Sequence, residues 1–332
     1  MRKRVEMEFE KTAKEIARVI DQSEHFVILG HKDPDGDTLG CSLAFWEALN
    51  QKNKKAAIVM PEPLPKVYEF LPNWHVINNN GVAVPTGYAL FFFDSANVDR
   101  VGKESVYVDS ASIVINVDHH HSNTMFGDIN LVEPWRAATA EIVLDFLELL
   151  GYEITPSIAT NLYAAAYTDT GSFRHSNTNA QVLEAAARLA KYGADVVGVA
   201  EQVYKSMPPT TVKLLALALN DIRYECEGKV AWTCITQQML EVANAAMSES
   251  EEITEAMQSI KGVKVALVFK EIGPNLTKVS FRSKGNIDVS VIAEKFGGGG
   301  HVNAAGCEIQ APIDHACMQV VSHVLNVVGG SN

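Results

Sequence analysis

The sequence predicts an α/β protein in which a mostly parallel sheet carries helices on both faces and a smaller α/β domain follows across a cleft. The first part of the chain alternates short β-rich runs with segments whose apolar residues recur at helical spacing, a pattern typical of parallel sheets covered by helices. The chain has 332 residues, which is long for one core and comfortable for two domains.

The predicted first domain covers residues 1–205. Its strand candidates are short runs rich in β-branched and aromatic residues, namely His25–Leu29, Ala56–Met60, Tyr88–Phe93 and Ile113–Val117. Its helix candidates have apolar residues three or four positions apart, and they are Thr38–Leu49, Ala137–Leu150, Ile158–Tyr167, Gln181–Lys191 and Val196–Tyr204.

A break follows at Ser206-Met207-Pro208-Pro209, because proline removes a backbone donor and interrupts regular structure. We expect residues 206–222 to form a linker helix and residues 223–332 to form the second domain. Its strand candidates are Val230–Thr236, Val263–Phe269 and Lys278–Arg282, the last two as a pair. Its helix candidates are Gln237–Ala246, Asp288–Phe296 and Ile313–Val328, with Thr210–Asn220 in the linker.

The charge balance limits the partners of the chain. Lys and Arg number 28 and Asp and Glu number 40, so the net charge is −12. Because basic side chains on phosphates supply most of the affinity for duplex nucleic acid, we expect no duplex partner. A small anionic substrate stays compatible if a bound divalent metal reverses the charge locally.

Cysteine usage and hydropathy favour the cytoplasm. The charged start, Met1–Glu10, lacks the apolar core of a signal peptide, and the longest apolar runs are too short to span a bilayer, so we expect no membrane partner. The five cysteines form no CxxC pair, which fits reduced thiols better than disulfides or a structural zinc site.

Potential metal ligands follow the strand candidates. His31-Lys32-Asp33-Pro34-Asp35-Gly36-Asp37 follows the first strand, Asp94-Ser95-Ala96 the third, and Asp118-His119-His120-His121 the fourth, while Asp169 ends a helix. Because the carboxyl ends of parallel strands share one edge, we expect these residues to converge. Carboxylates with imidazoles suit Mn²⁺, Mg²⁺ or Fe²⁺, and two such ions would relieve the repulsion between the carboxylates.

Each motif taken alone has an ordinary structural explanation. Asp-Pro-Asp-Gly is usually a turn, Asp94 could cap a helix or turn, consecutive histidines can form a solvated loop, and Asp169 could be a helix-end residue. Four loops on one predicted edge that all offer ligands for hard metals are difficult to explain by these readings together.

The run Gly297-Gly298-Gly299-Gly300-His301 favours an anion site, because glycines let a ligand approach the backbone N–H groups. It is not a Walker A loop, since no Gly-Lys-Ser/Thr follows. A flexible turn is the alternative for the glycines, and a solvated side chain is the alternative for Arg282 upstream.

These motifs together resemble the DHH phosphoesterase superfamily. Asp118-His119-His120 after a buried strand, preceded by His31-x-x-Pro34-Asp35-x-Asp37, is similar to its defining motifs, and Asp94-Ser95-Ala96 and Asp169-Thr170-Gly171-Ser172-Phe173 are similar to its other metal motifs. The run Gly297–Gly306 resembles the signature of the DHHA1 domain. The five motifs occur in order over nearly the whole chain.

The resemblance implies a catalytic metal-binding DHH domain and a substrate-binding DHHA1 domain, with two divalent ions, Mn²⁺ as the expected metal and Mg²⁺ or Fe²⁺ as alternatives. The implied ligands of one ion are His31, Asp35 and Asp94. Those of the other are Asp37, Asp94, His119 and Asp169, so that Asp94 bridges both ions.

The resemblance also implies roles for residues around the ions. His120 would orient the nucleophile or phosphate and assist proton transfer, so that it and Asp94 are the catalytic residues. Asp118 would orient its neighbours, His121 is assigned only a contact with substrate, and Asp33 is expected in a turn. The implied substrate-binding residues are Arg282, Ser283, Gly298, Gly299, Gly300 and His301.

Within the superfamily the chain resembles NrnA-type oligoribonucleases. This resemblance implies hydrolysis of short oligoribonucleotides (nanoRNA) to mononucleotides, of 3′-phosphoadenosine 5′-phosphate (pAp) to AMP, or of both. A phosphodiesterase for cyclic di-AMP or its linear product pApA is the alternative, and the complete ligand set argues against a catalytically dead nucleotide-binding regulator. The expected partner is short single-stranded RNA or a small nucleotide, and a homodimer is compatible with the sequence.

Overall fold

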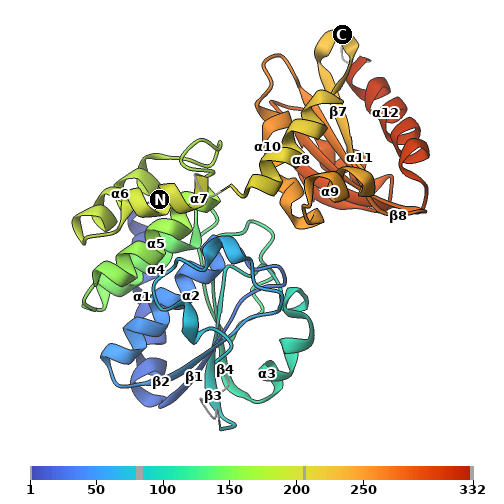
Figure 1. Cartoon of the computed structure of the whole chain (residues 1–332). Helices are drawn as coiled ribbons and strands as arrows, with labels where there is room; N and C mark the ends of the chain where they lie inside the picture. Colours follow the sequence, from blue (N-terminus) through green and yellow to red (C-terminus); the bar gives the residue numbers. More distant parts are fainter. Residues whose placement is uncertain (1, 80–84, 205–206, 330–332) are drawn as a thin grey trace. The chain divides into compact units, whose positions relative to one another are not determined.

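The computed structural model describes residues 2–79, 85–204 and 207–329 (Figure 1). The chain divides into two compact units, Met1–Ser206 and Met207–Asn332, each with its own hydrophobic core. The prediction of an α/β fold with a smaller second domain is confirmed. The predicted boundary between residues 205 and 206 lies outside the described residues.

The first unit contains a five-stranded parallel sheet in the order β2-β1-β3-β4-β5. The strands are β1 (His25–Leu29), β2 (Lys55–Val59), β3 (Tyr88–Phe93), β4 (Ala111–Asp118) and β5 (Ile129–Val132). The sequence analysis missed β5, whose four residues give only two buried positions. The chain turns from β1 to β2 on one side and to β3 on the other, and ligands bind at the carboxyl ends of strands where the order reverses in this way.

Helices cover the first sheet unequally (Figure 1). The α-helices are α1 (Arg2–Gln22), α2 (Gly36–Gln51), α3 (Val106–Asp109), α4 (Thr139–Leu149), α5 (Pro156–Asp169), α6 (Ala180–Lys191) and α7 (Val196–Tyr204). Phe26 and Ile28 of β1 face the large core shared with α2, α4 and α5, whereas Val27 and Leu29 face a smaller core under η3 (Val98–Ser105) and α3. Strands that bury both faces explain the near-continuous apolar runs in the sequence.

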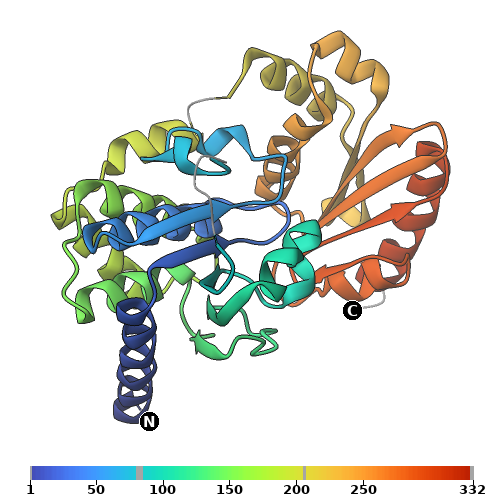
Figure 2. The same cartoon turned by 90° about the horizontal axis from the view of Figure 1, so that it is seen from below.

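Helix α1 was not predicted as an element. Its buried residues Ala13, Ile16 and Ile20 pack into the large core, and the helix contacts β5, the edge strand. Figure 2 shows its N-terminal half projecting away from the sheet, and Met7 there is exposed. The exposed residues Glu8 and Glu10 therefore belong to an amphipathic helix whose buried residues lie in its C-terminal half.

The second unit contains a six-stranded mixed sheet in the order β10-β11-β9-β8-β7-β6. The strands are β6 (Arg223–Glu225), β7 (Val230–Ile235), β8 (Val265–Gly273), β9 (Leu276–Ser283), β10 (Gly299–His301) and β11 (Ala304–Ile309). Strands β7 and β8 are parallel, and the predicted pair β8 and β9 is confirmed as antiparallel.

Helices also cover both faces of the second sheet. On one face are α8 (Pro209–Asn220), α9 (Gln237–Ala243) and α10 (Glu251–Ser259), and on the other are α11 (Val289–Glu294) and α12 (Ile313–Gly329). Helix α8 packs against α9, α10 and β7, which places it inside this unit, whereas the sequence analysis gave residues 206–222 as a linker helix.

In the three described ranges, no helix is both long and apolar enough to cross a membrane.

Candidate metal centre

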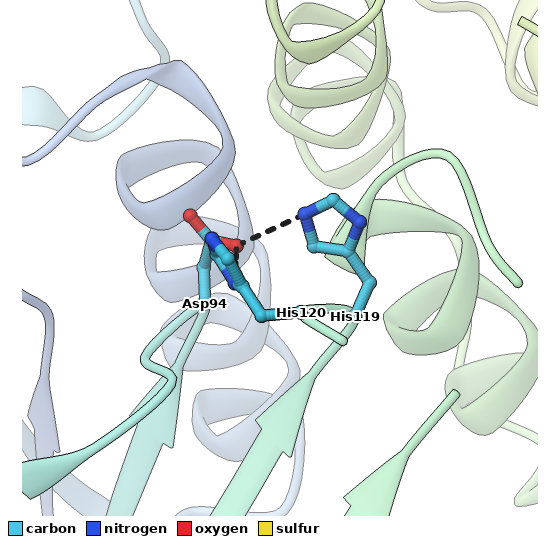
Figure 3. Close-up of side chains that lie close together, drawn as sticks. All are labelled: Asp94, His119 and His120. Atoms are coloured by element: carbon cyan, nitrogen blue, oxygen red, sulfur yellow. Dashed lines mark ion pairs between the residues drawn. The ribbon is translucent and has the colours of Figure 1, made fainter. Parts of the chain in front are cut away.

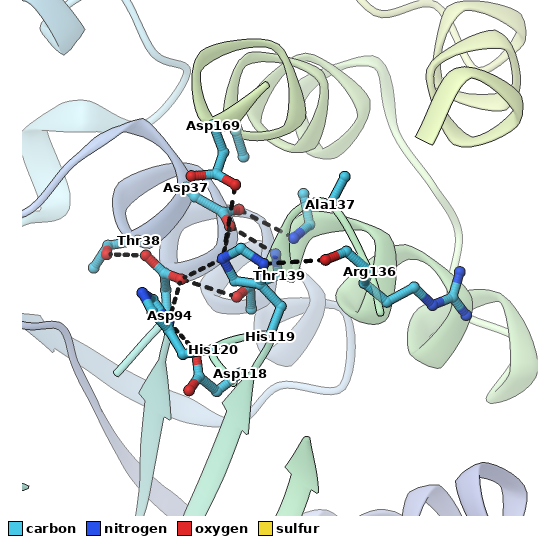
Figure 4. Close-up of polar contacts among 12 residues, drawn as sticks. Asp37, Thr38, Asp94, Asp118, His119, His120, Arg136, Ala137, Thr139 and Asp169 are labelled. Carbon is cyan, nitrogen blue, oxygen red and sulfur yellow. Dashed lines mark hydrogen bonds and ion pairs between the residues drawn. The ribbon is translucent and has the colours of Figure 1, made fainter. Parts of the chain in front are cut away.

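The predicted ligands lie at the carboxyl edge of the first sheet, around the point where the strand order reverses (Figure 4). His31 follows β1, Asp94 follows β3, His119 and His120 follow β4, and Asp169 ends α5. Segments that are far apart in sequence therefore meet at one place, as the strand pattern predicted.

The Asp-Pro-Asp-Gly motif caps helix α2. Asp35 is the N-cap residue, and its Oδ1 accepts hydrogen bonds from the backbone N–H groups of Asp37 at 3.0 Å and Thr38 at 3.1 Å. This leaves Oδ2 free to face His31, whose Nε2 lies 4.0 Å away. A side chain at Gly36 would meet the Thr168 hydroxyl oxygen at 2.3 Å, so glycine lets α2 approach α5 closely.

Asp94 is the central group of the site (Figure 3). Its side chain is 2% exposed, and its backbone has the unusual φ of 59°. His119 Nε2 lies 3.4 Å from one carboxylate oxygen, and His31 Nε2 lies 3.6 Å from the other. The hydroxyls of Thr38 and Thr139 each donate to one of these oxygens, at 3.0 and 3.1 Å. Asp94 therefore faces both groups of predicted ligands.

Backbone carbonyls orient two of the histidines. The Nδ1 of His31 lies 2.7 Å from the carbonyl oxygen of Lys32, and the Nδ1 of His119 lies 3.2 Å from that of Arg136. A carbonyl only accepts, so Nδ1 carries the proton in each case. Without a metal ion, Nε2 of each imidazole faces a carboxylate and is favoured in its protonated form. Once a cation displaces that proton, the Nε2 lone pair can bind the ion.

Asp37 and Asp169 approach His119 from two helices. Asp37 is fully buried and accepts from the N–H groups of Thr139 at 2.6 Å and Ala140 at 3.0 Å, at the start of α4. Its Oδ2 lies 4.0 Å from His119 Nε2, and the Oδ2 of Asp169 lies 3.7 Å from the same nitrogen. His119 thus joins Asp37, Asp94 and Asp169.

These contacts produce three groups of potential ligand atoms. In each group the atoms all lie within 4.8 Å of one another. The groups are His31, Asp35 and Asp94; Asp37, His119 and Asp169; and Asp94, His119 and His120. The structure brings together all six residues predicted as ligands, along with His120. Oxygen and imidazole donors in overlapping groups fit divalent cations such as Mn²⁺ or Mg²⁺.

The electrostatics of the centre also fit a cation. Burial, followed by the charges of Asp94 and Asp169, raises the pKa of Asp37 well above its ordinary value. Burial raises the pKa of Asp169 to about 7, although the charge of His119 opposes the shift. Burial alone would lower the pKa of His119, but the hydrogen bond to Asp94 and the nearby carboxylates outweigh it and raise that pKa to about 11. The carboxylates thus hold positive charge at the site in the form of protons, and a divalent ion can replace these protons.

His120 also pairs with Asp118, which lies next to the ligand groups. His120 Nδ1 lies 2.7 Å from Asp118 Oδ1, and Asn123 donates to Asp118 Oδ2 at 2.5 Å and to Asn116 at 2.7 Å. Asp118 is fully buried and belongs to none of the three groups, so it holds His120 in place. His121 is exposed, and Asp33 is exposed with a turn-like φ of 56°.

The residues predicted to bind substrate lie at β9 and β10 of the second unit. Arg282 is half-buried on β9, where it pairs with Ala304 of β11. Ser283 donates its hydroxyl to the Ile287 carbonyl at 2.6 Å and accepts from Asn303 at 2.9 Å, so this hydroxyl holds a turn. The backbone of His301 ends β10, and its side chain lies outside the described residues.

Two of the four glycines, Gly299 and Gly300, form a short strand with His301, whereas Gly297 and Gly298 lie just before it. A Cβ on Gly298 would lie 2.1 Å from the Gly306 carbonyl oxygen, and one on Gly300 would lie 2.5 Å from that of Ala304, whereas Gly299 faces open space. Two glycines are therefore needed for the close approach to β11. Beside them is an open pocket of about 400 Å³ lined by Lys278, Gly297, Gly298, Gly299, Gly306, Cys307 and Glu308.

Sequence reasoning did not identify several residues that complete these sites. Thr38, Thr139 and Asn123 hold carboxylates of the metal centre, and Lys278 and Glu308 line the pocket. The hydroxyl and amide residues leave no signal in ligand spacing, because common polar residues occur throughout the chain. Lys278 could have been found, since it lies four residues before Arg282 on the same face of a predicted strand.

Known proteins resemble this chain in both of its units. The model of the DHH family, N-terminal domain, matches residues 25–167, and that of the DHHA1 domain matches residues 233–326. The bifunctional oligoribonuclease and PAP phosphatase NrnA of Thermus thermophilus is 35% identical over 90% of this chain and 88% of its own length. The cyclic-di-AMP phosphodiesterase PdeA of Listeria monocytogenes is 27% identical over 98% of this chain and 51% of its own length.

A solved structure shares the fold. The crystal structure of an exopolyphosphatase-related protein from Bacteroides fragilis has a TM-score of 0.88 and 23% identity, and the likeness covers 95% of this chain and 96% of that one. Clusters of carboxylates and imidazoles that can hold divalent cations are found in phosphatases and nucleases, among other hydrolases. Together with the similarity to NrnA, the family match shows that this chain is a phosphoesterase hydrolase. It belongs to the DHH family, and its second unit contains a DHHA1 domain.

Proposed function

We propose that the chain is a two-metal phosphoesterase that hydrolyses short oligoribonucleotides to mononucleotides and pAp to AMP. The observation that carries this proposal is the overlap of three potential ligand groups at Asp94 and His119. The similarity to NrnA of Thermus thermophilus over nearly the full length of both chains supports the substrate class.

Six residues would hold two divalent ions, with Mn²⁺ as the proposed metal. His31, Asp35 and Asp94 would hold one ion, and Asp37, Asp94, His119 and Asp169 would hold the other. When bound, the ions would act as Lewis acids that activate a water nucleophile and stabilise charge on the phosphoryl oxygens.

The remaining residues of the centre would orient the substrate and transfer a proton. Because Asp118 already engages Nδ1 of His120, Nε2 is the nitrogen left to contact a phosphate oxygen or the leaving oxygen. Asp118 would keep this tautomer and stabilise the imidazolium form. In the second unit, Arg282, His301 and the backbone of Gly298–Gly300 would bind the nucleotide through charge-assisted hydrogen bonds.

A substrate panel tests the proposal. Purified protein with Mn²⁺ would be given pAp, a diribonucleotide, pApA and cyclic di-AMP at equal concentrations, and the products would be separated by chromatography. We expect AMP from pAp and mononucleotides from the diribonucleotide, with no turnover after chelation. The proposal would be refuted if none of the four substrates were hydrolysed with Mn²⁺, Mg²⁺ or Fe²⁺ present.

A phosphodiesterase for cyclic di-AMP is the second candidate. The similarity to PdeA of Listeria monocytogenes over nearly this whole chain favours it. The same panel separates the two, because a cyclic-dinucleotide enzyme should open cyclic di-AMP at least as fast as it cleaves the diribonucleotide.

A further inference from the structure

One short segment contacts three of the six predicted ligands. Residues 136–140 run from the end of the β5–α4 connection into the first turn of α4. The carbonyl of Arg136 accepts a hydrogen bond from His119 Nδ1 at 3.2 Å. Thr139 donates its N–H to Asp37 at 2.6 Å and its hydroxyl to Asp94 at 3.1 Å, and Ala140 donates its N–H to Asp37 at 3.0 Å. The position of this segment therefore affects the orientation of all three ligands (Figure 4).

Helix α4 depends on these contacts as well. Its N-cap residue, Ala138, has no side chain that can satisfy the first N–H groups of the helix. Asp37 accepts from two of these groups across about a hundred residues of sequence, and its negative charge is favoured at a helix N-terminus. The ligand and the helix start thus hold each other.

The Arg136 side chain points away from the centre and fixes the segment from behind (Figure 4). Its Nε lies 2.8 Å from Glu133, one Nη lies 2.5 Å from Asp145, and the other lies 3.5 Å from Glu141. Glu141 in turn accepts from the N–H of Ala137 at 2.7 Å. The guanidinium is largely buried, so these bonds are poorly screened by water.

Arg188 provides a comparison within the same ionic network. It pairs with Asp145 at 2.6 Å and with Glu148, both in the C-terminal half of α4. A purely structural ionic network would make Arg136 and Arg188 similar in effect, because each joins two elements through carboxylates. Arg136 differs because its own carbonyl contacts a predicted ligand.

We propose that Arg136 is a positioning residue for the metal centre. Its guanidinium holds residues 136–140 so that its carbonyl orients His119 and the start of α4 orients Asp37. This inference rests on the two-metal centre proposed above. It predicts an asymmetry, because the segment contacts Asp37 and His119, which belong to one proposed ion site alone. Of the ligands proposed for the other ion, the segment contacts only the shared Asp94, through the Thr139 hydroxyl.

Metal binding by the full chain tests the asymmetry without any substrate. Metal-free wild type would be titrated with Mn²⁺ by calorimetry, and free Mn²⁺ would be followed by electron paramagnetic resonance, with two ions expected. Arg136→Lys keeps the charge but loses the forked geometry. In this variant we expect the Mn²⁺ affinity of the site with Asp37 and His119 to fall about tenfold, and that of the site with His31 and Asp35 to stay within about threefold of wild type. Arg188→Lys is the matched control and should leave both affinities unchanged.

A second pair of variants probes the hydroxyl on the shared carboxylate. Thr139→Val removes the donor to Asp94 and keeps the shape and the N–H, so both affinities should fall by at least about threefold, while Thr139→Ser should restore them. This pair decides the question if Arg136→Lys does not fold, as judged by circular dichroism.

Three results would overturn the inference. The first is a folded Arg136→Lys with both affinities unchanged. The second is an equal loss in Arg136→Lys and Arg188→Lys, which would indicate a general effect of stability. The third applies if Arg136→Lys does not fold but the threonine variants do: Thr139→Val then binds both Mn²⁺ ions with the same affinities as Thr139→Ser. A wild type that binds fewer than two Mn²⁺ ions would instead reject the proposed metal centre, and this inference with it.

Discussion

At the scale of single residues, the centre is organised by groups that are not ligands themselves. Carbonyls of Lys32 and Arg136 fix the tautomers of two histidines, and Thr38 and Thr139 occupy the outer lone pairs of Asp94. Such contacts reduce the number of orientations that each ligand must lose when a metal binds. The crowded carboxylates are thereby held ready for a cation.

Asp94 is the residue whose loss should be most costly. In Asp94→Asn the shared anionic charge disappears while the shape is kept, and because a ligand matters more than an outer contact, we expect turnover to fall by at least about a hundredfold. Asp33→Asn is the matched control, since Asp33 is an exposed turn residue. Initial rates at saturating Mn²⁺ measure the effect, and near-normal rates in Asp94→Asn would remove Asp94 from the bridging position.

Metal binding should release protons. The pKa of His119 is raised to about 11 and that of Asp169 to about 7, so near neutral pH His119 holds a proton and Asp169 holds part of one. A metal must displace these protons, so its apparent affinity should rise with pH by about tenfold per unit for each proton released. Calorimetric Mn²⁺ titrations at pH 6, 7 and 8 in buffers of different ionisation enthalpy measure this, and a pH-independent affinity without proton release would contradict it.

At the scale of elements, the sequence was informative where structure is local. The buried strands were predicted from apolar runs, and the metal edge followed because parallel strands end on one side. Strand β10 was missed because four glycines resemble a loop, and only its pairing with β11 makes it a strand. The contacts of Thr139 with Asp37 were also beyond sequence reasoning, since nothing local signals a bond across about a hundred residues.

Two neighbouring glycines should respond differently to alanine. In Gly298→Ala the added Cβ meets the Gly306 carbonyl at 2.1 Å, so β10 must separate from β11, and we expect a loss of about 1–3 kcal/mol in the stability of the second unit. In Gly299→Ala the methyl group faces the open pocket, so stability should be retained while KM rises. Hydrogen exchange of the second unit and steady-state kinetics measure the two effects, and equal destabilisation by both variants would contradict the different roles.

At the scale of the whole molecule, two units with separate cores allow a division of labour. All six predicted ligands lie in the first unit, and the predicted nucleotide-binding residues lie in the second. The metal-ligand motifs and the glycine run predicted this division from the sequence. The sequence did not predict which of nanoRNA, pAp and cyclic di-AMP is the preferred substrate. We expect that choice to depend on the pocket beside the glycines, whose lining residues come from three strands and a glycine run.

A variant in the second unit should separate binding from metal loading. Arg282→Ala should raise KM for nucleotides about tenfold or more, because a charge-assisted contact to phosphate is lost. Bound Mn²⁺, measured by elemental analysis, should stay at the wild-type level. Lys264→Ala is a suitable control, since this exposed lysine precedes β8 and is not proposed to bind substrate. Loss of metal in Arg282→Ala would argue against the division of labour.

Substrate length should be limited by the same charge balance. A net charge of −12 leaves no basis for a long basic track, so affinity must come from a few contacts to one terminal nucleotide. Additional nucleotides would find few partners, and we expect catalytic efficiency to peak between dinucleotides and roughly pentanucleotides. Cyclic di-AMP should be slower than pApA, because its closed ring offers no terminal phosphate. A series of RNA lengths at fixed Mn²⁺ and salt measures this, and processive degradation of a long strand that leaves the dinucleotide behind would require an extended single-strand site that the acidic composition does not predict.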